Sequence, residues 1–163
     1  MVAEEVQAQP LESNLVSEQV METVLSKWQD LKLNEISNFY NGTFIDCTED
    51  GQYPVYGANG KIGSTNKYNY ENIIIIGRVG AYCGSVFYVK NKCWATDNTI
   101  VIKAKNNTSI KFLYYLLNAL NLNNFAGGSA QPLLTQGWLK PLKISLPSLP
   151  TQKKIVKILS IYD

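Results

Sequence analysis

The chain has 163 residues, of which 45% are hydrophobic and 17% are charged. This length and composition are typical of one globular domain with short appendages and exclude an intrinsically disordered protein. The longest aliphatic run, Ile73 to Ile76, is far shorter than the ~20 apolar residues of a membrane-spanning helix. Glu4 and Glu5 stand where a signal peptide would be basic, so we expect a cytoplasmic protein.

The chain contains no histidine and three cysteines, none of them in a Cys-x-x-Cys pair. We therefore expect no zinc site and no other bound metal. The lack of histidine also removes the commonest general base and the Ser-His and Cys-His nucleophile pairs.

Charge is unevenly distributed along the chain. Residues 1–31 hold six acidic residues and one lysine, net −5, whereas residues 32–163 hold 14 basic and 7 acidic residues, net +7. A basic body with an acidic leader suits a domain that binds a polyanion. A lysine-rich surface that only contacts solvent is the alternative, and charge alone does not separate the two.

The first predicted element is an amphipathic helix. Apolar residues recur at helical spacing from Val16 to Leu31, with Ser13 or Asn14 available as the N-cap. Its apolar face either packs on the body or binds a partner, and the sequence leaves both open.

The middle of the chain is β-branched, aromatic and punctuated by glycine and asparagine, which is typical of short strands. We expect residues 57–67 and 77–84 to be loops. The predicted strands are Tyr53–Tyr56, Ile73–Ile76, Ser85–Val89 and Thr99–Ile102.

A helix is predicted from Ser109 or Ile110 to about Leu120, followed by a loop over residues 127–139 and a strand over residues 142–146. A last helix begins at Ser148. The whole is an α+β fold: a β-rich domain with a C-terminal helix and a short N-terminal one. The apolar stripe of the last helix, a candidate partner interface, is Ile155, Ile158, Leu159 and Tyr162.

Catalytic and nucleotide-binding motifs are absent. GANGKIGS (57–64) has two residues between its glycines and Ile62 after Lys61, which excludes a Walker loop. No GxGxxG follows a strand, and no Asn/Asp-Pro-Pro-aromatic loop of a methyltransferase occurs. The one acid two residues before a lysine, Asp30, falls in the predicted N-terminal helix and not on a nuclease strand. We expect a binding protein, not an enzyme.

The predicted loops are rich in side chains that contact bases and phosphates. In ENIIIIGRVGAYCGSV (71–86) the only arginine, Arg78, precedes a glycine-spaced turn. We expect it to contact guanine or phosphate, with a salt bridge at the core edge as the alternative. Asparagine and glycine are also common in turns that bind no ligand, so a purely structural role is the alternative for each residue. The candidate DNA-binding residues are Tyr56, Asn59, Lys61, Ser64, Asn66, Arg78, Tyr82, Thr96, Asn98, Ser129 and Gln131.

Taken together and in order, these segments resemble the specificity subunits of type I restriction–modification systems. WQDLKLNEISNFYNG resembles the entry to a target recognition domain of that family. GQYPVYGANGKIGSTNKY, IIIIGRVGAYCGSVFYV and CWATDNTIVI resemble its middle. KFLYYLLNALNL and GGSAQPLLTQGWLKPLKISLPSLPTQKKIVKIL resemble its close and the start of the spacer helix.

The resemblance implies a non-catalytic subunit that reads one half of a bipartite target on double-stranded DNA. Its partners would be methyltransferase subunits and the motor and nuclease subunit. Those partners, and not this chain, would bind the methyl donor, ATP and magnesium. We divide the chain into an acidic N-terminal segment (1–31), which the charge distribution separates, and two parts that the resemblance implies, a target recognition domain (32–147) and the start of a spacer helix (148–163).

Full subunits of the family have two recognition domains and two complete helices, whereas this sequence has one domain and a short helix. A half subunit that pairs with a second copy and a truncated fragment both fit. Two other functions remain open: a decoy that binds the methyltransferase without targeting DNA, and a recognition domain split from a fused restriction–methylation enzyme.

Overall fold

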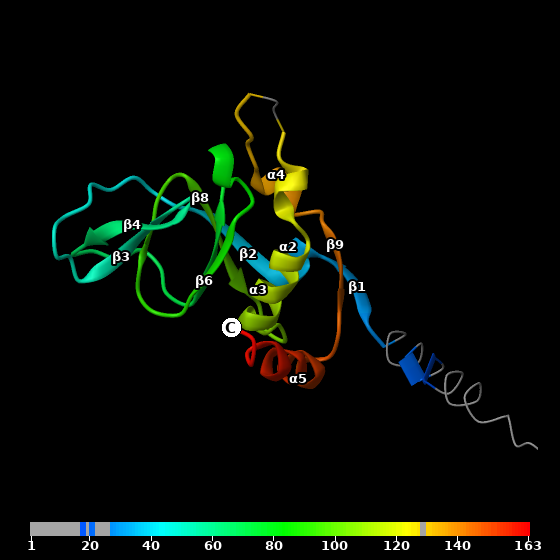
Figure 1. The fold of residues 1–163 in the computed structure, drawn as a ribbon. Coiled ribbons are helices and arrows are strands. Elements are labelled where there is room, and N and C mark those ends of the chain that lie inside the picture. Colours follow the sequence, from blue (N-terminus) through cyan, green and yellow to red (C-terminus); the bar gives the residue numbers. More distant parts are fainter. Residues whose placement is uncertain (1–16, 19, 22–26, 128–129) are drawn as a thin grey trace, which may run out of the picture.

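The computed structural model describes residues 17–18, 20–21, 27–127 and 130–163. It has the expected α+β architecture (Figure 1). The strands are β1 (Gln29–Lys32), β2 (Ser37–Asn41), β3 (Tyr53–Gly57), β4 (Gly60–Thr65), β5 (Ile73–Gly77), β6 (Val86–Val89), β7 (Trp94–Ala95), β8 (Thr99–Ala104) and β9 (Lys143–Leu146). The helices are α2 (Leu33–Ile36), η1 (Gly80–Tyr82), α3 (Ile110–Ala119), η2 (Leu122–Phe125), α4 (Gln136–Leu139) and α5 (Leu149–Leu159).

The central sheet has the order β2-β8-β5-β6, and each neighbouring pair is antiparallel. Ile74 and Ile76 of β5 pack with α3 in the larger core cluster, whereas Ile73 and Ile75 pack in a second cluster on the other face. All four isoleucines are fully buried. The apolar run is unbroken because both faces of β5 are covered, whereas a strand with one solvent-exposed face would alternate apolar and polar residues.

The bounds of helix α3 confirm the prediction for this segment. The helix covers one face of the central sheet. Ser109 is its N-cap and accepts a hydrogen bond from the Phe112 amide (3.3 Å), the arrangement that serine favours at a helix start. Phe112, Leu113 and Leu117 form its buried stripe.

A second sheet, β4-β3-β7, corrects the expectation that residues 57–67 are a loop. Strand β3 pairs antiparallel with β4 and parallel with β7. The glycine-rich sequence of β4 lacks the apolar alternation of a strand, and its conformation comes from pairing with β3. Strands β2 and β7 and the short helices α2 and α4 were also not predicted.

A third pairing corrects the end of the N-terminal helix. Trp28 is not helical, and β1 pairs antiparallel with β9, with Leu31 opposite Ile144. In the described part of the N-terminal segment, Ser17, Glu18, Val20 and Met21 are helical. The long-range pairing with β9 overrides the helical spacing of residues 28–31, and the division placed at residues 31/32 falls inside β1.

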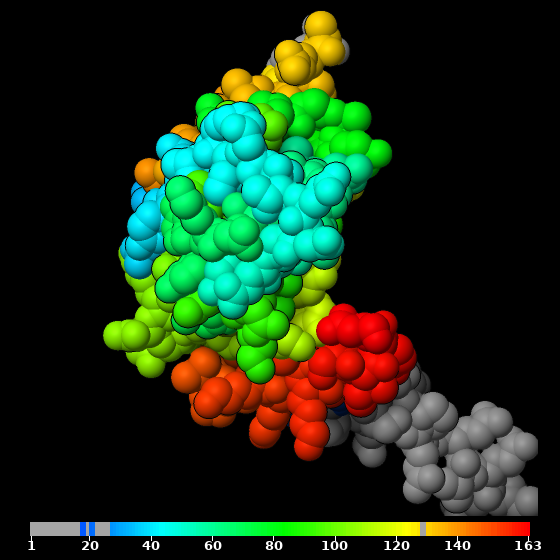
Figure 2. Space-filling model, turned by 90° about the vertical axis from the view of Figure 1, so that its left-hand side faces the viewer, coloured from blue at the N-terminus to red at the C-terminus, as the bar shows by residue number. Residues whose placement is uncertain are grey.

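The loop before α4 and helix α5 lie at opposite ends of the domain (Figure 1). Seen from the side, the hairpin of β3 and β4 covers much of the face, and α5 projects below it (Figure 2).

Candidate nucleic-acid interface

Four segments meet at one end of the domain, which we call the loop end: residues 57–60, 77–84, 96–98 and 130–135. Backbone hydrogen bonds join three of them: the Arg78 amide donates to the Asn98 carbonyl (2.9 Å), and the Leu134 amide donates to the Arg78 carbonyl (2.9 Å). The Gly80 amide donates to the Pro132 carbonyl (3.1 Å). The loop end is therefore held mainly by main-chain contacts.

Gly77 brings the β3–β4 turn into the loop end. A Cβ on Gly77 would lie 2.4 Å from the Tyr82 carbonyl oxygen and 2.7 Å from that of Ala58, so only glycine lets the three backbones approach this closely. Gly84 has φ +88°, and a Cβ there would meet the Asn123 amide at 2.4 Å. These two glycines fix the start and the end of the Arg78 turn.

A buried thiol supports the same turn from below. The Cys83 thiol donates to the Arg78 carbonyl (3.3 Å), which thus accepts from both Cys83 and Leu134. Burial raises the pKa of the Cys83 thiol, while the hydrogen bond from the Leu134 backbone lowers it. The net effect is a raised pKa of the Cys83 thiol, which keeps the thiol protonated, as a hydrogen-bond donor must be.

Five of the sequence-predicted residues come together at the loop end. Arg78 is half-buried, and the other four are exposed. Within the described residues the Arg78 side chain has no ion-pair or hydrogen-bond partner, so the alternative of a salt bridge at the core edge is wrong there. The five are Asn59, Arg78, Tyr82, Asn98 and Gln131.

The structure corrects the prediction that Thr96 is a DNA-binding residue at the surface. Its side chain is only 5% exposed, and its buried hydroxyl has no hydrogen-bond partner among the described residues. It lies under the loop end and is not available to a ligand at the surface. Its own amide donates to the Tyr56 carbonyl (3.0 Å), which ties β7 to β3.

Two other predicted residues support a turn away from the loop end. The Ser64 hydroxyl donates to the Thr48 carbonyl and accepts from the Gly51 amide, both at 2.9 Å. The side-chain oxygen of Asn66 accepts from the Gln52 amide (3.2 Å). Both side chains thus hold residues 48–52 against β4.

Tyr56 and Lys61 face each other across the β3–β4 register, next to the loop end. Lys61 is exposed. Burial, and secondarily the nearby Cys93 thiol, raises the pKa of Tyr56, so its phenol stays a neutral donor. Ser129 lies outside the described residues.

Sequence reasoning missed two features outside the loop end. The Gln136 side-chain amide donates to the Asn41 side-chain oxygen (2.8 Å) and joins α4 to β2, and the nearby Trp138 is 61% exposed. Lys103 lies over the rings of Tyr40 (5.8 Å) and Tyr70 (5.6 Å). Only the register, which places Tyr40 opposite Val101 and so on the face of Lys103, could have revealed the second feature.

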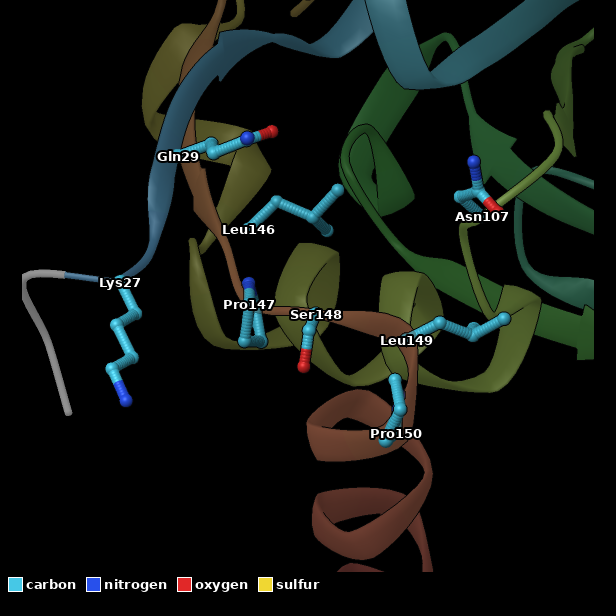
Figure 3. Close-up of a pocket in the computed structure, with 8 residues that line it drawn as sticks. All are labelled: Lys27, Gln29, Asn107, Leu146, Pro147, Ser148, Leu149 and Pro150. Carbon is cyan, nitrogen blue, oxygen red and sulfur yellow. The ribbon is translucent and has the colours of Figure 1, made fainter.

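The predicted partner stripe on α5 divides in two. Ile155 is half-buried against the larger core cluster, so the domain itself covers it. Ile158 (59%) and Leu159 (38%) are exposed on α5. Tyr162 is also exposed (84%), but it lies past the end of α5 at Leu159, which corrects its placement on the helical stripe. Beside the start of α5 is a hollow of about 390 Å³, lined by Lys27 and Gln29 on one side and residues 146–150 on the other (Figure 3).

Asp30 and Lys32 lie on strand β1, which corrects the placement of Asp30 in a helix. The Asp30 carboxylate accepts from the Ser145 hydroxyl (2.5 Å). The described residues include no group of three or more Cys, Asp or Glu arranged to hold a metal ion. Nor does any helix in the described ranges have the length and apolarity to span a bilayer.

Comparison with known proteins gives consistent matches. A family model described as "Type I restriction modification DNA specificity domain" matches residues 25–163. The chain is 37% identical over 112 residues to the type I restriction enzyme EcoprrI specificity subunit of Escherichia coli, covering 68% of this chain and 28% of that protein. It is 30% identical over 118 residues to the MpnII specificity subunit of Mycoplasma pneumoniae, covering 69% of this chain and 36% of that one.

Solved structures share the fold. The S subunit of the type I system from M. genitalium has a TM-score of 0.74 at 21% identity, over 83% of this chain and 39% of that one. The HsdS subunit of Thermoanaerobacter tengcongensis has a TM-score of 0.62 at 20% identity, over 92% and 44%. The chain thus spans less than half the length of these similar proteins.

Proposed function

Because the chain belongs to the type I restriction modification DNA specificity domain family, we propose that its loop end reads one half of a bipartite DNA target. The observation that carries this proposal is the convergence of four loops on one end, with Asn59, Arg78, Tyr82, Asn98 and Gln131 directed to the surface or its edge.

The side chains at this end match the chemistry of base edges. Arginine bonds guanine O6 and N7 in a bidentate manner, and asparagine or glutamine does the same to adenine N6 and N7. Arg78 is the strongest candidate because its guanidinium has no partner within the described residues. Lys61, next to the loop end, suits a phosphate contact that positions the domain without reading sequence.

The backbone of the loop end is preformed by its main-chain hydrogen bonds. A preformed surface loses little conformational freedom on binding, which favours affinity and register on the duplex. Variation of the exposed side chains on this frame would change the target while leaving the fold intact.

The opposite end suits protein partners. Ile158 and Leu159 on α5, and Tyr162 just after it, leave an apolar surface that helices of a methyltransferase subunit, or of a second copy of the chain, would cover. In this scheme residues 32–147 form the recognition domain and residues 148–163 begin a spacer helix. Bond making, and the binding of methyl donor, ATP and magnesium, belongs to the partner subunits. This chain is then a cytoplasmic component that performs no catalysis, and its lack of histidine supports the second point.

Coexpression with the cognate methyltransferase subunit, followed by methylome sequencing, tests the proposal. We expect a new bipartite methylated motif that is absent when the methyltransferase is expressed alone. A symmetric motif would indicate pairing of two copies of this chain. No new motif would contradict the proposal.

Salt dependence of binding gives an independent check. If lysines contact phosphates, the logarithm of the binding constant should fall linearly with the logarithm of salt concentration, with a slope of about −0.9 per phosphate contacted. Binding that is indifferent to salt would contradict the phosphate contacts.

A further inference from the structure

A buried side-chain amide joins the base of α5 to the domain. Gln152 lies in the second turn of α5 and is fully buried. Its side-chain oxygen accepts from the Ser109 amide (2.8 Å), and its side-chain nitrogen donates to the carbonyls of Asn107 (3.1 Å) and Pro147 (2.9 Å). Both amide hydrogens are therefore used, together with the oxygen.

The three partners of Gln152 belong to two separate connections. Asn107 and Ser109 lie in the turn between β8 and α3, whereas Pro147 lies between β9 and α5. Figure 3 shows Asn107 and Pro147 on either side of the start of α5. The Gln152 side chain thus fixes α5 to the N-terminus of α3 and to the segment from which α5 itself emerges.

An amide is the side chain that this position requires. It must donate twice and accept once, which glutamine does and a carboxylate or an alkyl group does not. A buried carbonyl or amide left without its partner is unfavourable, because it has lost its hydrogen bonds to water and gained none in return. A carboxylate here would also place negative charge against two carbonyl oxygens.

Besides Gln152, apolar packing holds α5 on the domain, and the Tyr115 hydroxyl of α3 donates to the Asp163 carboxylate just after the helix. Ile155 and Val156 are half-buried against the domain, and beyond them Ile158 and Leu159 are exposed. A helix of 11 residues is about 16 Å long, so a tilt of about 10° at its base moves its far end by about 3 Å. The contacts at the base therefore help to set where the exposed face is presented.

We propose that Gln152 is a positioning residue that sets the angle at which α5 leaves the domain. On the function proposed above, that angle sets the separation between this recognition domain and whatever α5 binds. It thereby fixes the length of the gap between the two halves of the DNA target. The first step, the angle of α5, does not rest on the proposed function. The second step, the length of the gap, does.

The first step is tested on the full chain with two spin labels. One label goes on the exposed native Cys47 and one on Lys157→Cys, an exposed site on α5; Cys83 and Cys93 are buried and should not react. We expect a narrow distance distribution in the parent and a shifted or broadened one in Gln152→Glu. Gln29→Glu, an exposed position with the same change of charge, is the matched control and should leave the distribution unchanged.

Two further measurements separate positioning from loss of fold. Gln152→Met removes the hydrogen bonds without adding charge and should also broaden the distribution, which keeps the test decisive if Gln152→Glu does not fold. Acidification should narrow the distribution of Gln152→Glu again, because a protonated carboxyl regains one donor, and should not affect Gln29→Glu. Unchanged distributions in both Gln152 variants would overturn the proposal.

The second step is tested in the methyltransferase complex by methylome sequencing. We expect Gln152→Glu to reduce methylation at the original gap by about tenfold or more, or to relax the gap, while binding of an isolated half-site is kept. Full methylation at an unchanged gap would overturn this step. If the parent complex methylates no motif, the proposed function fails, and the spin-label distances still decide the role of Gln152.

Discussion

The two ends of this domain are held by opposite means. At the loop end, main-chain hydrogen bonds and two close glycine contacts set the shape, and the side chains point outward. At the α5 end, one buried side chain, Gln152, bonds to both connections beside the helix, and we propose that these bonds set the helix direction. A surface whose frame does not depend on its exposed side chains tolerates their substitution. A junction that depends on one amide does not.

The largest expected effect comes from separating the loop end from the core. Leu134 is fully buried in the larger core cluster, and its amide holds the Arg78 carbonyl. Leu134→Ala should reduce the free energy of unfolding by about 2–5 kcal/mol, measured by urea denaturation. The neighbouring Leu133 is 39% exposed, and Leu133→Ala should change the free energy of unfolding by no more than about 0.5 kcal/mol. Equal effects of the two would show that the loop is not anchored through Leu134.

Gly77→Ala should distort the loop end from within. The added methyl would press on the carbonyls of Tyr82 and Ala58, and overpacking of this kind costs about 1–3 kcal/mol. We expect half-site DNA binding, measured by fluorescence anisotropy, to be lost even where the chain remains folded. Gly137→Ala is the control, because its methyl would meet only the Thr135 hydroxyl, at 3.6 Å. Normal DNA binding by Gly77→Ala would mean that the close approach is not needed.

Arg78→Ala should affect binding alone. We expect a loss of about 1–3 kcal/mol in DNA affinity, with relaxed preference at one base pair if Arg78 reads a base. Stability should change by no more than about 0.5 kcal/mol, since the guanidinium has no partner within the described residues. Arg78→Lys separates the two kinds of contact: lysine can replace arginine at a phosphate but not in a bidentate bond to guanine. A loss of stability equal to the loss of affinity would assign Arg78 to the fold.

The smallest expected effect tests the removal of Thr96 from the interface. Thr96→Val replaces the unpartnered buried hydroxyl by a methyl group and should stabilise the chain by about 1 kcal/mol without changing DNA affinity. Thr99→Val is the matched control and should destabilise it, because the Thr99 hydroxyl donates to the Thr96 carbonyl (2.6 Å). Weaker DNA binding by Thr96→Val would return Thr96 to the interface.

Local patterns were sufficient where an element is specified by its own residues. The isoleucine run predicted β5, and the spacing of Phe112, Leu113 and Leu117 predicted α3 with its serine cap. The ordered series of motifs also identified the family, which the comparisons confirm. Hydrophobic periodicity and capping act over a few residues, so one sequence shows them directly.

Only the tertiary structure decided how distant segments meet. Strand β4 forms because β3 pairs with it, and β1 forms because β9, more than 100 residues later, lies beside it. The candidate list included both Thr96 and Asn98, and their sequence context does not show that one is buried and the other exposed. Gln152 looks like any polar residue on a helix until its three partners are seen. Burial and long-range hydrogen bonding depend on residues far away in the chain, and a local pattern carries no record of them.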